Sequence, residues 1–595
     1  MALNRKIAYI DLDTETVKLE QIPLEWRRKF IGGRGLDAYL LYTNAPRGCD
    51  PLGAENVVII SAGMLGGTLA SSGSRTHIAA KSPLTHLLGS ASMGGFFAPE
   101  MRWAGIDHFV IRGRANRPVY IYVHDGKIEF RDADAVWGSG VYDTHAMIRR
   151  ELGDEETQIL CIGQAGENLV RYAAVMTGRK DAAARTGMGA VLGSKNLKAI
   201  ACRGTMEIEI SNPEEALEYN KETIDQVISS KASQSMQRWG TNFMFGITNT
   251  TGLVRTHNFQ YNQLPNSEDL EAENLEQYSV GMDACFGCQV HCRHRYVIKE
   301  GEYAGTYGLG PDFTGQGAFG AEVGCRSMDT VLVCNHLVND YGLDTLEVGS
   351  MIAWAMELYE EGIITDKDTH GLNLEWGNDQ AVIEMVKQVA FREGLGDLLA
   401  EGPLLAAQKL GPASLKYLIH VKGMSNLNTD ERAAPALALS IAVSSRGSDN
   451  LRGIPAIDLY NLPMELLEKI YREPDGYDGP LTNSFSEYEG KARMVMWQEL
   501  CYMAVESLGV CKYHTVFLSP NHPAFSEFAR LIQLNVGLEF NEMDLWNCAN
   551  RSYTIERLFN LREGMTRADD MLSDRYFDEP TRLGLPIAQG KHIDR

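Results

Sequence analysis

Three of the eleven cysteines lie in one short stretch, CFGCQVHC, which places Cys285, Cys288 and Cys292 in a C-x2-C-x3-C array. This spacing lets one loop wrap several thiolates around one inorganic centre, and a [4Fe–4S] cube needs four thiolates in total. A fourth cysteine must then come from another part of the chain. A structural zinc site is the first alternative, because His291 and His294 share the loop. The second alternative is a set of cysteines that only pack.

Two glycine-rich stretches with basic residues, 71–95 and 178–200, are predicted to be loops whose backbone approaches a ligand. Glycine removes the side chain from such an approach, and Arg or Lys supplies a cation for phosphate or another anionic group. The residues concerned are Arg75, Lys81, Gly94, Gly95, Arg185, Gly187, Gly189, Gly193 and Lys195. Neither stretch contains a P-loop or a dinucleotide-binding glycine motif. Ordinary turns with solvated charges are the alternative.

Two six-residue stretches share the pattern polar–x–x–Gly–aliphatic–polar, namely NDYGLD at 339–344 and ESLGVC at 506–511. Each follows a predicted helix. One interpretation is a pair of glycine helix caps. The other is a pair of loops that present backbone and carboxylate groups to two similar ligands.

The predicted secondary structure changes along the chain. Short apolar runs predict strands in the first 208 residues, with a strand–turn–strand at the N-terminus and a hairpin at 119–133 around Asp125-Gly126. A helix is expected to begin at Pro213. Apolar residues at three- and four-residue spacing then predict helices at 328–340, 344–363, 379–393, 396–409, 487–507, 522–537 and 551–576. The expected fold class is α+β, with a β-rich domain at 1–208 and two mostly helical domains at 209–420 and 421–595.

The composition excludes several classes of protein. A chain of 595 residues with a net charge of −22 is a poor general binder of nucleic acid or anionic membranes. No apolar run approaches the roughly 18 residues of a membrane span, and the N-terminus lacks the apolar core of a signal peptide. An odd number of cysteines without a secretory signal argues against a disulfide framework. We therefore expect a cytoplasmic enzyme with no nucleic-acid or membrane partner.

Taken together, these features resemble the aldehyde:ferredoxin oxidoreductase family of tungsten enzymes. The resemblance runs along nearly the whole chain and includes 32–35 (GGRG), the surroundings of Arg75, 91–95, 185–198, the cysteine array, both six-residue motifs and 445–447 (SRG). It implies a β-rich domain that carries two pterins, with two helical domains covering them. It also implies one tungsten ion held by two pterin dithiolenes, with molybdenum not excluded, and a [4Fe–4S] cluster beside one pterin. A magnesium ion bridging the pterin phosphates is a further candidate cofactor.

The resemblance also assigns roles to residues of this chain. Cys285, Cys288, Cys292 and Cys511 are expected to bind the cluster. Each six-residue motif is expected to hold one pterin. The residues expected to bind the cofactors are Arg75, Gly94, Gly95, Arg185, Gly187, Asn339, Gly342, Leu343, Asp344, Glu506, Gly509 and Val510.

The chain departs from the family near the expected reaction centre. Relatives carry a Glu–aromatic–Glu stretch where this chain has Asp312, Phe313 and Thr314, and a later histidine is Asn450 here. The Glu of a Lys-Gly-x-Glu motif is absent from 422–426, and the leading Asp of the two pterin motifs is Asn or Glu. Asn can orient a group or donate a hydrogen bond but cannot titrate. Asp312 is therefore the candidate base, Thr314 and Asn450 are the candidate catalytic residues at the other two changed positions, and His257 is a candidate for compensating the lost histidine.

The expected activity is oxidation of an aldehyde to a carboxylic acid, with electrons leaving through the cluster to ferredoxin or an electron-transfer subunit. The alternative is a reductive active-site subunit that resembles tungsten-type benzoyl-CoA reductase and acts on an acyl-CoA. A third reading is an electron relay or assembly subunit without turnover of its own. Both homodimers and complexes with a ferredoxin-like subunit occur in the family, so a homo- or hetero-oligomer is expected.

Overall fold

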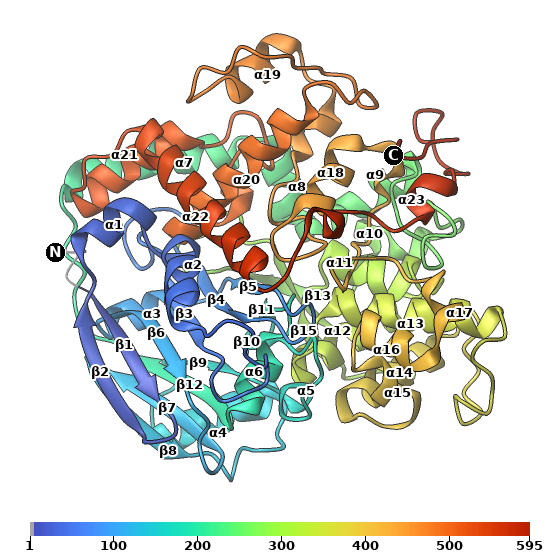
Figure 1. Cartoon of the computed structure of the whole chain (residues 1–595), viewed down its shortest axis with the longest axis horizontal. Coiled ribbons are helices and arrows are strands. Elements are labelled where there is room, and N and C mark those ends of the chain that lie inside the picture. Colours follow the sequence, from blue (N-terminus) through green and yellow to red (C-terminus); the bar gives the residue numbers. More distant parts are fainter. Residues whose placement is uncertain (1–4) are drawn as a thin grey trace.

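Two six-stranded sheets form the N-terminal region of the chain, and helices cover them (Figure 1). The structure, a computed structural model, describes residues 5–595. The first sheet contains, in spatial order, β2 (Thr16–Gln21), β1 (Lys6–Asp11), β6 (Ile106–Arg112), β3 (Val58–Ala62), β4 (Thr76–Lys81) and β5 (Leu88–Met93). The second contains β11 (Asp181–Ala183), β10 (Val175–Thr177), β9 (Gln158–Cys161), β12 (Leu197–Arg203), β7 (Val119–His124) and β8 (Lys127–Asp132). The N-terminal strand–turn–strand and the hairpin around Asp125-Gly126 are thus confirmed.

The central strands of the first sheet are apolar on both faces, because each face packs on a different layer. Alternate side chains of the strands, such as Ile59 and Val110, pack with Leu36 and Leu40 of α2 (Gly33–Asn44). The intervening side chains face the second sheet and α3 (Phe97–Trp103). Strand side chains alternate between faces with period two, so two covered faces require apolar residues at nearly every position.

The sequence prediction was wrong about the extent of the two glycine-rich loops. Residues 71–95 contain β4 and β5, and residues 178–200 contain β11, α6 (Met188–Ser194) and the start of β12. The strands THIAAK and LGSASM are almost entirely buried. Small side chains let neighbouring layers pack closely there, but in the sequence they look like a turn-rich segment.

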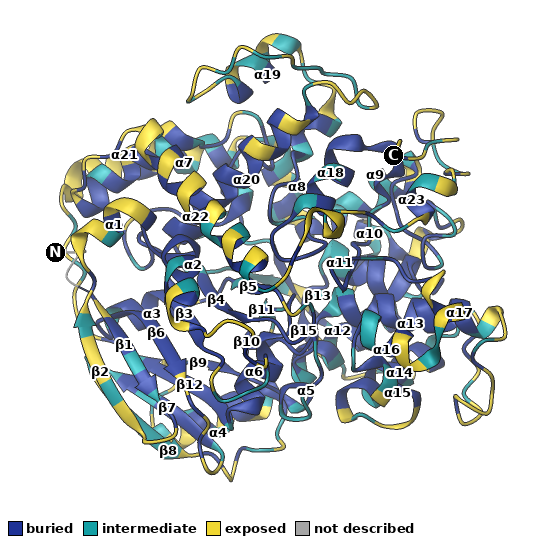
Figure 2. Cartoon of the chain, viewed as in Figure 1, coloured by how far each residue is buried: buried dark blue, intermediate teal, exposed yellow. Residues whose placement is uncertain are grey.

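Helices make up most of the chain after residue 212, as the sequence predicts. The middle of the chain packs around α12 (Met328–Tyr341), α13 (Thr345–Glu360), α14 (Asp379–Phe391), α15 (Gly394–Leu399) and α16 (Pro403–Leu410). A second helical core contains α20 (Lys491–Leu508), α21 (Phe525–Val536) and α22 (Glu542–Arg562). Figure 2 shows α13 mostly buried, whereas α21 and α22 carry exposed residues along their outer sides. The α+β fold class is confirmed, whereas the domain boundaries stay predictions.

Several helix boundaries differ from the prediction. The expected helix at 396–409 is two helices, α15 and α16, because Gly402 lies between them with φ +78°. The helix expected at 551–576 begins earlier, at Glu542, where Asn541 Oδ1 accepts from Asp544 N. It ends at Arg562, and Gly564 follows with φ +102°. The helix α7 (Pro213–Ile228) begins with Pro213 in its first turn, as predicted.

The N-terminal region and α20 meet through their backbones. Met64 N donates to Ser507 O at 3.1 Å, and Leu65 N donates to Leu508 O at 2.8 Å. A Cβ on Gly63 would lie 2.0 Å from Gly509 N, so only glycine fits there. This contact places the end of α20 on the first sheet. Within the described residues, no helix has the length and apolar character needed to cross a bilayer.

Candidate functional site

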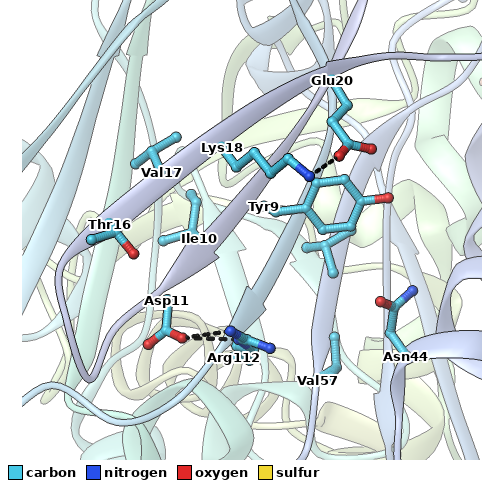
Figure 3. Close-up of a pocket in the computed structure, with 11 residues that line it drawn as sticks. Tyr9, Ile10, Asp11, Thr16, Val17, Lys18, Glu20, Asn44, Val57 and Arg112 are labelled. Carbon is cyan, nitrogen blue, oxygen red and sulfur yellow. Dashed lines mark hydrogen bonds and ion pairs between the residues drawn. The ribbon is translucent and has the colours of Figure 1, made fainter.

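An open groove of about 540 Å³ lies on the outer side of the first sheet but does not contain the predicted site (Figure 3). Its charged side chains pair with each other: Lys18 with Glu20 at 2.5 Å and Arg112 with Asp11 at 2.9 Å. None of the residues expected to bind a cofactor lines it. Most of the predicted residues gather instead where the two six-stranded sheets meet α20 and a three-stranded sheet that contains β13 (Ser279–Asp283), β14 (Arg293–Val297) and β15 (Tyr307–Leu309).

The four predicted cluster cysteines come from two loops that Ser72 joins. Cys285, Cys288 and Cys292 lie between β13 (Ser279–Asp283) and β14 (Arg293–Val297), and Cys511 follows α20. Ser72 N donates to Gly287 O in the first loop at 2.7 Å. Ser72 Oγ accepts from the backbone N–H of Cys511 in the second loop at 3.3 Å.

The four thiols influence one another electrostatically. Burial raises the pKa of Cys288, and the neighbouring Cys511, Cys285 and Cys292 raise it further. Like charges so close together cannot all ionise unless cations compensate them. Arg75 supplies one such cation, since its Nη2 donates to Cys511 Sγ at 3.0 Å. Burial alone would lower the pKa of Arg75, but Cys511 and Cys285 outweigh it and raise the pKa.

Gly94 and Gly95 are required by the packing around Cys285. A Cβ on Gly94 would lie 2.5 Å from Cys285 Sγ and 2.8 Å from Asp181 Oδ1. Gly95 has φ +91°, and its carbonyl accepts from Phe286 N at 3.1 Å. These glycines therefore bring the end of β5 against the cysteine loop.

The first six-residue motif ends one helix and begins the next. Gly342 adopts the left-handed conformation that caps α12, with φ +71°. Asp344 caps α13 by accepting from Leu346 N and Glu347 N. Leu343 is buried, and the Asn339 side chain donates back to Asn335 O within its own helix. Asp344 is thus the side chain of this motif that lies beside Arg185.

Arg185 connects this motif with strand β17 (Met424–Ser425) and with the loop that follows α18 (Pro435–Val443). Its guanidinium lies 3.4 Å from Asp344 Oδ2 and 3.3 Å from Glu347 Oε2. It also donates to Ser425 O at 2.6 Å and Ser448 O at 2.9 Å. Burial raises the pKa of Glu347 to about 7, although Arg185 opposes the shift.

The backbone conformation and the close packing at Gly187 both require a glycine. Its φ is +76°, and a Cβ there would lie 1.9 Å from Arg171 O. This contact explains the residue without a ligand, and its role in cofactor binding stays a prediction.

The second six-residue motif carries a buried carboxylate that pairs with three cations. Glu506 lies 3.0 Å from Arg34 and 2.8 Å from Lys512, and it also pairs with Arg452. Burial by itself would raise the pKa of Glu506, but Arg452, Lys512 and Arg34 hold it well below its usual range. Arg34 also binds Glu556 at 2.7 Å, so three cations face two carboxylates.

The two motif sites are neighbours. Arg446 pairs with Asp449, and burial and the charge of Arg452 lower its pKa. The charges of Arg185 and Arg34 both act on Arg446, which places it between the two sites. Within residues 5–595, the buried polar atoms of this region that lack a hydrogen-bond partner include Arg185 Nε, Arg446 Nε, Arg452 Nε, Ser444 Oγ and Ser448 Oγ, together with Asp449 Oδ2, which is ion-paired with Arg446. Buried polar atoms are normally hydrogen-bonded. Three of these atoms are arginine donors, so the region fits an anionic, hydrogen-bonding ligand.

Gly509 and Val510 complete the second motif. Gly509 caps α20 in the left-handed conformation, with φ +80°, and its carbonyl accepts from Arg75 N at 3.0 Å. Val510 is buried in the core around α20. The interpretation of both motifs as glycine caps is therefore correct, and the caps lie beside the cluster cysteines and the buried cations.

Asp312 lies beside the cysteine loop. It is the residue before α11 (Phe313–Gln316), and its carboxylate pairs with Lys180 Nζ at 2.6 Å. Its side chain is 42% exposed, and its charge raises the pKa of Cys292. Thr314 lies in α11 and is half-buried. An accessible carboxylate is thus present next to the cysteine loop.

The other two candidate catalytic residues are placed differently. Asn450 is half-buried in the loop that contains Arg446 and Arg452. His257 stacks on Trp376 with ring centroids 4.6 Å apart, and burial lowers its pKa to about 4. None of its described contacts is with a candidate site residue, which favours a structural histidine. The catalytic roles of both residues stay predictions.

The sequence did not predict several residues of the site. No role was assigned to four cations, because isolated cations in a sequence look like solvated surface charges. These four are Lys180, Arg293, Arg452 and Lys512. Arg34 and Arg446 did lie in the GGRG and SRG stretches that carried the family resemblance. For those two arginines, a cation flanked by small residues was the sequence pattern that could have indicated a place in the site.

Comparison with known proteins agrees with this geometry. Residues 7–204 match the family model of the aldehyde ferredoxin oxidoreductase N-terminal domain, and residues 218–593 match the model of domains 2 and 3. The chain belongs to the aldehyde ferredoxin oxidoreductase family. It is 34% identical to the tungsten-containing aldehyde ferredoxin oxidoreductase of Pyrococcus furiosus over 581 residues, covering 97% of this chain and 91% of the relative. The chain is therefore an oxidoreductase.

Two further proteins that are similar to this chain are not named aldehyde ferredoxin oxidoreductases. The aliphatic sulfonate oxidoreductase, WOR-like subunit, of Pyrococcus furiosus is 31% identical over 497 residues, covering 79% of this chain and 78% of the relative. The solved active-site complex BamBC of benzoyl coenzyme A reductase with 1,5-dienoyl-CoA superposes with a TM-score of 0.84 at 26% identity. That match covers 99% of this chain and 92% of the solved chain. The family is thus shared by proteins with different named substrates.

Replacing Cys288 tests whether the cysteine group binds iron. Cys288→Ala should lose most of about four irons per chain, because three thiolates bind a cube poorly. Cys501→Ala is the matched control, since Cys501 is a buried cysteine of α20 outside the group. Iron analysis of anaerobically purified protein is the measurement. Normal iron in Cys288→Ala would contradict the assignment.

Glu347 should make stability fall as the pH rises. Its pKa in the folded chain is about 7, above the ordinary value of 4.5, so the folded state holds a proton that the unfolded state releases. Its contribution is then favourable below pH 4.5 and is lost as the pH rises through 7. Glu347→Gln should remove this loss, which amounts to about 3 kcal/mol.

The measurement is unfolding from about pH 5 to about pH 8 for wild type and Glu347→Gln. The stability of the variant relative to wild type should increase across this range. Glu25→Gln, a change at an exposed carboxylate paired with Lys29, is the control and should show no such trend. Parallel curves for wild type and Glu347→Gln would show that Glu347 is ionised throughout.

Proposed function

We propose that this chain is a tungsten bis-pterin and [4Fe–4S] oxidoreductase that oxidises an aldehyde to a carboxylic acid. The observation that carries the proposal is the convergence of four cysteines with two capped motif loops and a buried excess of cations. The names of the tungsten-containing relatives support the metal, and thiolate ligands from the pterins would accept molybdenum as well. A magnesium ion between pterin phosphates is compatible with Asp344 and Glu347 beside Arg185.

The cysteine group supports an iron–sulfur cluster over zinc. A single zinc ion draws four ligands into one tight tetrahedron. Within the described residues, no group of three or more His, Cys, Asp or Glu side chains has an arrangement that could hold one metal ion. A cube binds each thiolate through a different iron and therefore holds the four sulfurs farther apart.

The residues of this chain bind and orient the cofactors and handle protons. Arg185, Arg446 and Arg452 offer buried donors to the anionic groups of the pterins. The metal centre supplies the two-electron redox chemistry when bound. Oxidation of an aldehyde consumes one water and releases two electrons and two protons. Asp312 accepts a proton, and Lys180 orients its carboxylate.

Cys285, Cys288, Cys292 and Cys511 would hold a cluster that supplies one-electron transfer to ferredoxin or a ferredoxin-like subunit. Three of these cysteines lie on a partly exposed loop, with Gly287 exposed between them. A partner protein that docks at this loop would come close to the four cysteines. Such a partner, or a second copy of the chain, would make the enzyme a hetero- or homo-oligomer.

Reduction of an acyl-CoA is the second candidate function. The likeness to a complex that contains 1,5-dienoyl-CoA, over 99% of this chain, favours it. The replacement of the family's Glu and His by Thr314 and Asn450 also favours chemistry other than that of the aldehyde-oxidising relatives. The reaction then runs in the opposite direction, with electrons entering through the cluster.

A substrate panel separates the two functions. Anaerobically purified protein that contains tungsten and iron should reduce a viologen dye with aldehydes, and it should fail to oxidise reduced viologen with acyl-CoA thioesters. Turnover with acyl-CoA alone would replace the first function by the second. Zinc in place of iron, with neither tungsten nor molybdenum, would refute both.

Asp312→Asn should lower turnover by about 10²–10⁴-fold, because the amide cannot accept the proton. Binding of iron and tungsten should not change. Asp283→Asn is the control, since Asp283 ends β13 just before the same cysteine loop and its carboxylate accepts from Ala284 N. Unchanged turnover in Asp312→Asn at every pH would remove Asp312 from the mechanism.

A further inference from the structure

Arg293 has an unusual position among the basic residues near the cysteines. It is the first residue of β14, directly after Cys292, and it is 5% exposed. Its Nη2 donates to Cys285 Sγ at 2.6 Å, and its Nη1 pairs with Asp181 Oδ2 at 2.5 Å. One guanidinium therefore contacts a predicted cluster ligand and a carboxylate at the same time.

Asp181 holds the guanidinium from the opposite side. Asp181 is the first residue of β11. The residue before it, Lys180, pairs with Asp312. The Asp181 carboxylate fits against Gly94 and Gly95, where any Cβ would lie within about 3.0 Å of its oxygens. Nη1 of Arg293 donates to Asp181 Oδ2, and because the guanidinium is planar this buried ion pair limits the directions in which its other N–H groups can point. One of these N–H groups points at Cys285 Sγ.

We propose that Arg293, positioned by Asp181, raises the reduction potential of the cluster by donating to the thiolate of Cys285. The inference rests on the cluster of the proposed function. Reduction adds one electron and no proton, so the reduced cluster carries one more negative charge. Hydrogen bonds and cations at the cluster sulfurs stabilise that charge and are known determinants of cluster potential. Burial strengthens the effect, because solvent and salt screen the charge poorly there.

Arg293 and Arg75 act at different ligands. Arg75 donates to Cys511 on the side of the motif loops, whereas Arg293 donates to Cys285 on the side of the β10–β11 hairpin. An arginine guanidinium does not lose its proton in proteins, so the charge of Arg293 is permanent. Arg293 is thus a positioning residue for electron transfer rather than a proton carrier.

A redox titration of the cluster followed by electron paramagnetic resonance tests the proposal in the purified holoenzyme. Arg293→Gln should shift the midpoint potential downward, because the donor and the cation are lost and Asp181 is left without its partner. Arg293→Lys keeps the charge without the fork and should fall between wild type and Arg293→Gln. Arg295→Gln and Arg295→Lys are matched controls, since Arg295 is an exposed arginine of the same strand.

Equal midpoint potentials in Arg293→Gln and Arg295→Gln, at normal iron content, would overturn the proposal. If Arg293→Gln fails to retain iron, the midpoint potentials of Arg293→Lys and Arg295→Lys are compared instead. A lower potential in Arg293→Lys supports the proposal, and equal potentials overturn it. Wild-type protein without iron would refute the cluster of the proposed function together with this inference. A normal cluster with unshifted potentials would refute this inference alone.

Discussion

The buried carboxylate of Glu506 is the constraint on which the arrangement of the site depends. Its three cations come from α2, from the loop after α18 and from the turn after α20. Burying an unpaired ion costs several kcal/mol, so displacing any one of these segments would leave buried charge uncompensated. Cys511 lies five residues after Glu506, and the same interaction therefore fixes the position of the fourth cysteine.

The elements with a local cause could be predicted from the sequence. The hairpin around Asp125-Gly126 and the helix start at Pro213 follow from backbone preferences of the residues themselves. The same holds for Gly342 and Gly509, which end their helices in the left-handed conformation. Strands β4 and β5 were missed because nothing local in their Ser, Gly and Ala residues favours a strand. Burial between two layers determines them.

In the site, too, features that depend on neighbouring residues could be predicted from the sequence, and features that depend on distant residues could not. The cysteine array is visible because its ligands are close in sequence, but its fourth member was found only through the family resemblance. Arg293 and Lys180 owe their importance to partners more than a hundred residues away, Asp181 and Asp312. A single sequence does not show such pairs. His257 was considered for its chemistry alone, and its stacking on Trp376 depends on a distant loop.

The link that Ser72 makes between the two cysteine loops has a consequence for biosynthesis. During translation Ser72 leaves the ribosome first, and the array at 285–292 follows. Cys511 leaves it only after α20 has been synthesised. In the proposed function, a cluster bound by all four cysteines would therefore be completed only late, after the ribosome has made most of the protein. It would close a long loop of chain and cross-link the two cysteine loops, which the structure connects through Ser72. Its insertion would then stabilise the docking of the end of α20 on the N-terminal sheets.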